Sequence, residues 1–180
     1  SDPGRRHSKA TQRGKAYMVS EAVHKSMQGN KRRDTRPERL MRELLRAAGL
    51  TGYRLQWKVP GHPDIAWPGK KVAIFVNGCF WHRCPHCKPP QPKSNVQYWV
   101  LKFERNEQRD AESLAKLAEL GWTVHVVWEC QLKKKAIDAT MAELLPQLAA
   151  ELGKPLRAGT TEVAGTATAE AANAAALETG

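Results

Sequence analysis

Residues 70–87, KKVAIFVNGCFWHRCPHC, contain the stretch that decides the fold. Every position from Val72 to Val76 is apolar, which is typical of a strand at the centre of a sheet covered on both faces. The segment that follows, residues 78–95, holds three of the four cysteines and four prolines and lacks a periodic apolar pattern. We therefore predict a central strand and, after it, a loop that something other than a hydrophobic core holds in place.

The cysteines, Cys79, Cys84, Cys87 and Cys130, indicate what holds this loop. The Cys84-x-x-Cys87 spacing is typical of a metal knuckle, and four thiolates form the closed tetrahedral site that holds structural Zn²⁺. Two disulfides or a redox pair are the alternatives. We see no secretory signal and so expect a reducing compartment, which disfavours disulfides. His86, between two of the cysteines, is the alternative metal ligand.

Outward from the central strand, apolar periodicity and turn residues predict the remaining elements. The predicted helices span residues 35–48, 96–120 and 136–152, and the predicted strands span residues 53–59, 64–67, 71–76 and 122–128. This order of elements indicates an α/β fold with three layers and a mixed central sheet.

Two of the predicted helices carry more specific expectations. Thr35 and Glu38 form a capping-box pattern, in which the Thr35 hydroxyl accepts from first-turn amides while Glu38 reaches back to the cap. In the long helix, apolar spacing predicts a buried side made of Val100, Phe103, Leu114, Leu117 and Leu120.

Charge divides the chain, whose 29 Lys+Arg and 18 Asp+Glu leave a net charge of +11. Residues 1–36 contain ten basic and three acidic residues, a net +7, and predict a basic arm that is partly helical around 20–30. Such a surplus attracts polyanions by counterion release, which favours nucleic acid as the partner over acidic lipid. No apolar run is long enough to span a bilayer, so we expect no membrane partner.

Composition also sets the predicted domain boundaries. Residues 37–152 hold every Trp, Phe and Cys of the chain, and we predict that they form the globular domain. Residues 153–180 are rich in Ala and Thr and lack aromatic residues, which predicts a disordered tail because too little apolar area can be buried.

One carboxylate and one histidine indicate a catalytic centre. Asp64 follows a Gly-His-Pro turn at the start of a predicted strand, beside the central strand. A carboxylate next to a neighbouring strand's carbonyl is a hard-oxygen site that suits Mg²⁺. His82, shortly after the central strand, could act as general base on a metal-bound water, as hydrolysis of a phosphodiester requires. Pro-Asp before a strand is also common turn chemistry, which is the alternative interpretation.

Four segments carry a family resemblance: PGHPD at 60–64, VNGCFWH at 76–82, NEQRD at 106–110 and VWEC at 127–130. Over residues 24–132 the chain resembles the very short patch repair (Vsr) mismatch endonucleases. The resemblance implies a restriction-endonuclease-like fold of the PD-(D/E)xK class and a structural zinc. It also implies a Mg²⁺-dependent nick 5′ of the thymine in a T:G mismatch. We accordingly expect a monomeric DNA repair enzyme of the bacterial cytoplasm, associated with the nucleoid.

The resemblance assigns catalytic roles to single residues. Asp64 and the backbone carbonyl of Val76 match metal-binding positions, and His82 matches the general base. Two acidic residues, Glu38 and Asp110, match positions that support the hydrated metal or the imidazole. Asn77 stands where some relatives have a second histidine, and Cys84 stands where some supply a zinc-binding histidine. These departures place all base chemistry on His82 and favour an all-cysteine zinc site.

The resemblance also implies how DNA is bound. Three aromatic residues, Phe80, Trp81 and Trp99, match side chains that wedge into the duplex from the major groove. Met27 matches an apolar residue that enters from the minor groove. The arm adds basic contacts, among them Lys25, Arg32 and Arg33. Unstacking a base step costs a few kcal/mol, which favours a weak mismatched pair over a sound one.

Two other functions stay open at this point. One is a nuclease with a different mismatch or site preference. The other is a zinc-stabilised DNA-binding module without catalysis.

Overall fold

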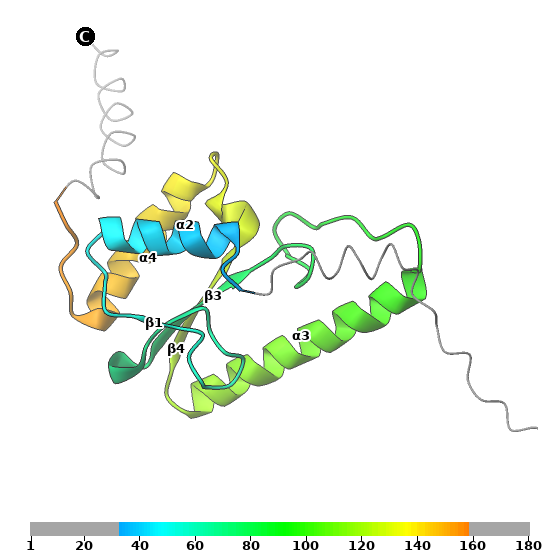
Figure 1. Ribbon diagram of the computed structural model, residues 1–180, viewed down its shortest axis with the longest axis horizontal. Coiled ribbons are helices and arrows are strands. Elements are labelled where there is room, and N and C mark those ends of the chain that lie inside the picture. The colour runs from blue at the N-terminus through cyan, green and yellow to red at the C-terminus, as the bar shows by residue number, and fades with distance from the viewer. Residues whose placement is uncertain (1–32, 159–180) are drawn as a thin grey trace, which may run out of the picture. The chain divides into compact units, whose positions relative to one another are not determined.

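The computed structural model describes residues 33–158 of the chain (Figure 1). Most of the predicted arm, with Lys25, Met27 and Arg32, lies outside the described residues, as does the tail from residue 159. Arg33 is described and is exposed. Within the described part, no helix is both long enough and apolar enough to cross a membrane.

Four strands form one mixed sheet in the order β1-β2-β3-β4. They are β1 (Arg54–Leu55), β2 (Ile65–Trp67), β3 (Val72–Asn77) and β4 (Thr123–Trp128). β1, β2 and β3 run antiparallel to one another, whereas β4 runs parallel to β3. The apolar strand β3 therefore pairs on both sides, which confirms that it is central.

Three α-helices accompany the sheet, close to the predicted ranges. They are α2 (Arg36–Ala47), α3 (Val96–Glu119) and α4 (Ile137–Leu152), with short 3-10 turns η1 (Pro68–Lys70) and η2 (Glu129–Leu132). α2, α3 and α4 end next to Gly49, Gly121 and Gly153, each of which has a positive φ that glycine adopts without strain. Residues 78–95 contain neither helix nor strand, as predicted.

The sheet separates α2 and α4 on one face from α3 on the other (Figure 1). On the first face, Val72, Ile74 and Val76 of β3 belong to the main hydrophobic core, together with residues of α2 and α4 such as Met41 and Leu148. This arrangement agrees with the predicted three layers. Phe75, between two of these β3 residues, faces the other way because side chains alternate along a strand.

The buried side predicted for α3 is wrong at three of its five positions. Phe103 and Leu117 are buried, but Val100, Leu114 and Leu120 are 38%, 37% and 50% exposed. A helix of 24 residues is about 36 Å long, whereas six-residue strands span about 20 Å. The N-terminal part of α3, with Val100, therefore extends past the sheet, whereas Leu114 and Leu120 lie toward the end that leads into β4 (Figure 1). The length of the helix accounts for Val100 alone.

Two segments differ from their predicted bounds. The strand predicted over 53–59 is reduced to β1, because Gln56 adopts a left-handed φ of 47° and turns the chain away. After α4, the chain continues to pack: Leu156 lies against the core, and the Arg157 N–H donates to the carbonyl of Ala48 at 3.1 Å.

Candidate active site and metal centre

Asp64 lies directly before β2, and its carboxylate is held from two sides. The backbone N–H of Val76, on the neighbouring strand β3, donates to Oδ2 at 2.7 Å. The side-chain amide of Gln56 donates to Oδ1 at 2.8 Å, and the Gln56 backbone N–H donates to the Asp64 carbonyl at 3.3 Å. These bonds orient the carboxylate, and each oxygen keeps a second lone pair for another partner.

The electrostatic surroundings of Asp64 disfavour its charged form. Burial, followed by the negative charge of Glu38, raises the pKa of Asp64 from 3.8 to about 6, against the opposing effects of the Val76 N–H, Gln56 and His82. Glu38 and His82 both act electrostatically on this carboxyl, so their charges lie near enough to influence Asp64. Two neighbouring carboxyl groups, Asp64 and Glu38, thus repel each other here, and a cation would relieve that repulsion.

Glu38, in the first turn of α2, is a buried carboxylate with only 6% exposure. Its oxygens accept from the Thr35 hydroxyl and from the Asp34 N–H, each at 2.8 Å. The predicted capping box is therefore wrong in one respect: the Thr35 side chain donates to Glu38 and does not cap the first-turn amides. Glu38 still reaches back, as predicted, but it accepts from the N–H of Asp34, the residue before the cap, and not from that of Thr35.

His82 lies in the loop after β3 and forms a pair with Asp110 of α3. Nδ1 of the ring and Oδ2 of Asp110 are 2.5 Å apart, and both side chains are about one-third exposed. A carboxylate at Nδ1 fixes the tautomer and leaves Nε2 able to accept a proton, the arrangement that a general base needs. Asn77 is the last residue of β3 and precedes His82 in the sequence; its side chain is half-buried.

Asn106 adds a contact that sequence reasoning did not single out. It is a buried residue of α3 whose side-chain amide donates to the Trp81 carbonyl at 3.0 Å. Its carbonyl oxygen accepts from the Arg109 guanidinium. The residues Trp81 and His82 are thus anchored to α3 at Asn106 and Asp110, one helical turn apart. A polar side chain on the predicted buried stripe of the helix was the available signal.

Gln56 is the second residue that sequence reasoning missed. In the sequence it is a polar residue of a predicted strand, where an outward-facing side chain is the ordinary expectation. Its role depends on the left-handed backbone at this residue, which periodicity does not reveal.

The four cysteines come together as predicted. The sulfur atoms of Cys79, Cys84, Cys87 and Cys130 all lie within 4.8 Å of one another, and none forms a disulfide. The Sγ atoms of Cys84 and Cys130 are 3.7 Å apart. With Zn–S bonds of about 2.3 Å, the edge of a tetrahedron is about 3.8 Å, so this donor set fits Zn²⁺. His86 is exposed and is not part of the group.

The surroundings of these sulfurs act in opposite directions: burial raises the pKa of Cys79 and of Cys130, whereas the pKa of Cys84 is lowered. The Cys130 N–H donates to Cys79 Sγ at 3.3 Å. Burial opposes charge on Cys84, but the N–H groups of Cys87 and His86, together with the thiols of Cys130 and Cys87, lower the pKa of this thiol. The cluster joins the 78–95 loop to η2, directly after β4, and so fixes the loop that carries His82.

The aromatic residues predicted to wedge into DNA form one cluster between this loop and α3. The Phe80 ring centre lies 5.2 Å from that of Trp81, 5.4 Å from Trp99 and 5.3 Å from Phe103. Phe103 is buried beneath the others, which are half-exposed. The side chains are therefore braced from below while part of each ring remains accessible.

Comparisons with known proteins show the family of the chain. A family model described as DNA mismatch endonuclease Vsr matches residues 18–88. The Type II nicking enzyme V.XorIIP of Xanthomonas oryzae is 43% identical over 122 residues, which cover 66% of this chain and 88% of that enzyme. DNA mismatch endonuclease Vsr of Escherichia coli is 36% identical over 127 residues, with coverages of 68% and 80%. V.NaeI, a Type II nicking enzyme of Lentzea aerocolonigenes, is 38% identical over 126 residues, with coverages of 67% and 75%.

A mixed α/β fold with a half-buried carboxylate, a histidine–aspartate pair and a cysteine cluster, in a chain with such relatives, defines an endonuclease that acts on DNA. Residues 18–88, which the family model matches, include both Asp64 and His82. The chain belongs to the Vsr family of DNA mismatch endonucleases.

Proposed function

We propose that this protein is a Mg²⁺-dependent enzyme of very short patch repair that nicks one DNA strand 5′ of the thymine in a T:G mismatch. The observation that supports the proposal is that the charges of Glu38 and His82 both act on the Asp64 carboxyl. The antiparallel β2–β3 pair that positions Asp64 beside β3 supports a restriction-endonuclease-like fold of the PD-(D/E)xK class. We further propose a monomer that works on the bacterial nucleoid in the cytoplasm.

The donor chemistry of the site fits Mg²⁺. The half-buried Asp64 and the buried Glu38 repel each other electrostatically, and the side-chain donor to Asp64 is the neutral amide of Gln56. Carboxylate oxygens are the hard ligands that Mg²⁺ prefers. Asp64 and the Val76 carbonyl would hold the ion, with Glu38 accepting from its waters. When bound, Mg²⁺ supplies a Lewis acid that activates water and neutralises charge on the leaving oxygen.

The remaining steps fall to side chains of this chain. His82 Nε2 takes the proton of the attacking water, while Asp110 holds the ring in orientation and stabilises the imidazolium that forms. Asn77 positions water or phosphate by hydrogen bonding, since an amide cannot take up a proton. Phe80, Trp81 and Trp99 unstack the base step beside the mismatch, assisted by Met27 and by the basic residues Lys25, Arg32 and Arg33.

The metal at the cysteine cluster has a different role. We propose that Cys79, Cys84, Cys87 and Cys130 hold Zn²⁺ as a closed structural site. Because four protein ligands leave no open position, this ion keeps the His82 loop in place and takes no part in the chemistry.

A nicking assay on end-labelled duplexes tests this function. The wild-type protein should cut the T strand of a T:G duplex in Mg²⁺, on the 5′ side of the thymine, and should leave the matched T:A duplex intact. Asp64→Asn should abolish nicking. Glu104→Gln, which changes an exposed carboxylate of α3, is the matched control and should retain it. Equal nicking by Asp64→Asn and wild type would exclude the catalytic role, and a panel of other mismatches would reveal a different preference.

A further inference from the structure

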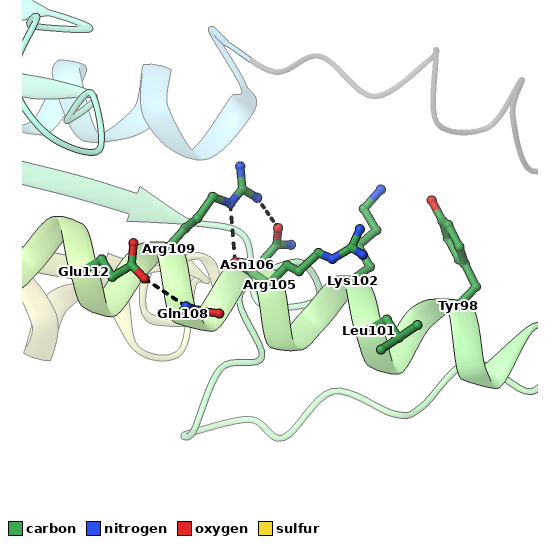
Figure 2. Close-up of a pocket in the computed structure, with 8 residues that line it drawn as sticks. All are labelled: Tyr98, Leu101, Lys102, Arg105, Asn106, Gln108, Arg109 and Glu112. Atoms are coloured by element: carbon green, nitrogen blue, oxygen red, sulfur yellow. Dashed lines mark hydrogen bonds between the residues drawn. The ribbon is translucent and has the colours of Figure 1, made fainter.

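A row of three cations follows the exposed side of α3. Lys102, Arg105 and Arg109, which we call the basic stripe, are three and four residues apart and so lie on one side of the helix. Figure 2 shows Lys102 and Arg109 rising from the same side of α3 as Tyr98, with Arg105 between them. These residues line a groove of about 760 Å³.

The groove carries a net positive charge. Besides the basic stripe, Glu112 is its one charged lining residue within the described part of the chain, and that carboxylate accepts from the amide of Gln108 at 2.9 Å. Three cations against one anion leave +2 in a concave surface, where fields are focused and polyanions are concentrated.

The basic stripe adjoins the aromatic cluster. Lys102 Nζ lies 5.2 Å from the centre of the Trp81 ring and 5.6 Å from that of Trp99. A nucleic acid strand whose bases met these rings would therefore bring its phosphates to Lys102.

The basic stripe also adjoins the catalytic pair. Arg109 donates to Asn106, which in turn holds the Trp81 carbonyl, and the next residue, Asp110, binds His82. From Lys102 to Arg109 the helix rises about 10 Å, the axial length of about three nucleotides in one strand of a duplex. The stripe can therefore follow one strand from the aromatic cluster past His82.

We propose that the basic stripe binds the sugar–phosphate backbone of the DNA strand beside the nicked bond, whatever its base sequence. The position of the nick in this inference rests on the proposed function, whereas the binding of DNA by the basic stripe does not. The charge of the groove decides its occupant: residues 1–36 carry a net +7 and would be repelled, whereas a phosphodiester backbone offers one negative charge per nucleotide.

Equilibrium binding as a function of salt tests this surface. Fluorescence anisotropy with labelled T:G and T:A duplexes would be measured between 50 and 300 mM NaCl, on the ~100 mM scale where counterion release dominates, without Mg²⁺ and without chelator. For Arg105→Gln/Arg109→Gln, the slope of log K against log[salt] should become shallower by about 2, because each lost phosphate contact removes about 0.9. At 0.1 M salt this corresponds to about 60-fold weaker binding.

The loss should be equal for the two duplexes, so that the preference for T:G is unchanged. Arg46→Gln/Lys70→Gln, which removes two exposed cations from α2 and η1, is the charge-matched control and should keep the wild-type slope. Arg105→Lys/Arg109→Lys should also keep it. Since Arg109 contacts Asn106, the single variant Arg105→Gln, with a slope change of about 1, excludes an effect of lost packing.

An unchanged slope, an equal change in the control, or a loss confined to the T:G duplex would overturn the proposal. The last result would indicate recognition of the mismatched bases. Because binding is measured without Mg²⁺, a wild-type protein that binds but never nicks would refute the proposed function and leave the basic stripe intact.

Discussion

Removing the charge of Asp64 should stabilise the protein while abolishing its activity. Burial, followed by repulsion from Glu38, raises the pKa of Asp64 from 3.8 to about 6. The folded state therefore binds more protons than the unfolded state between these values, and stability falls as pH rises from about 4 through 6. A difference of about two pH units corresponds to about 3 kcal/mol, lost in full above pH 6.

Asp64→Asn cannot ionise and escapes this loss. Its amide oxygen can still accept from the Val76 N–H, and Gln56 can rotate its own amide to accept from the new NH₂ group. We therefore expect the variant to be about 2 to 3 kcal/mol more stable than wild type at pH 8 and about equal to it near pH 4. Urea denaturation at a series of pH values, without added Mg²⁺, measures the difference.

Two results bear on this reasoning. Glu104→Gln, at an exposed position of α3, should show the wild-type dependence on pH. If Asp64→Asn and wild type differ by a constant amount from pH 4 to 8, or if the variant is the less stable at pH 8, then Asp64 is not a destabilising charge and the electrostatic description of the site is wrong. Added Mg²⁺ should narrow the gap at pH 8 by stabilising only the wild type, because a ligand that binds the folded state stabilises it.

Three further predictions concern the groups around Asp64 and His82. Gln56→Leu removes the donor to Asp64 Oδ1, so the Mg²⁺ concentration for half-maximal nicking should rise about tenfold in a metal titration. Asp110→Asn leaves His82 a neutral partner, and single-turnover nicking of T:G duplex should slow about 10²-fold. Stripping the metal from the cysteine cluster should lower the thermal transition and expose residues 78–95 to amide exchange, because structural Zn²⁺ contributes folding free energy.

Each of these three has a result that contradicts it. An unchanged Mg²⁺ requirement in Gln56→Leu would mean that the Val76 N–H alone orients the carboxylate. A normal rate in Asp110→Asn would remove His82 from the proton transfer. An unchanged thermal transition after chelation would show that the four thiols pack without an ion, and Cys84→Ser would then be no less stable than wild type.

The sheet was predictable because its signals are local. The uniformly apolar run of β3 can be buried only at the centre of a covered sheet, and Pro68 and Gly69 mark the tight β2–β3 connection. The helix ends were predictable for the same reason, since glycines with positive φ follow α2, α3 and α4.

The orientation of α3 was not predictable from its own sequence. Apolar residues occur on more than one side of this helix, and periodicity cannot tell which of them meets the sheet. The structure turns Asn106 inward, where it donates to the Trp81 carbonyl, and leaves Val100 exposed at the end of the helix that extends past the strands. A buried backbone carbonyl without a partner would cost more than an exposed valine does.

The sequence indicated the candidate site residues, but it did not indicate the residues that hold them in place. Asp64, His82 and the cysteines stand in recognisable patterns, but Gln56 acts through a left-handed backbone that the sequence does not mark with glycine. A non-glycine residue in this region of φ is costly and persists only where its surroundings demand it. Here the two bonds from Gln56 to Asp64 offset that cost, which explains why the predicted strand stops at β1.

Helix α3 holds both Trp81 and His82, which act together in the proposed reaction. Asn106 binds the Trp81 carbonyl and Asp110 binds the next side chain, His82, so the aromatic ring and the imidazole share a single rigid support. The cysteine cluster holds the other end of the same loop. A displacement of Trp81 by an inserted base step would therefore pull on α3 and on His82 alike. In the proposed reaction, the shared support of Trp81 and His82 on α3 would couple recognition of a distorted duplex to placement of the general base.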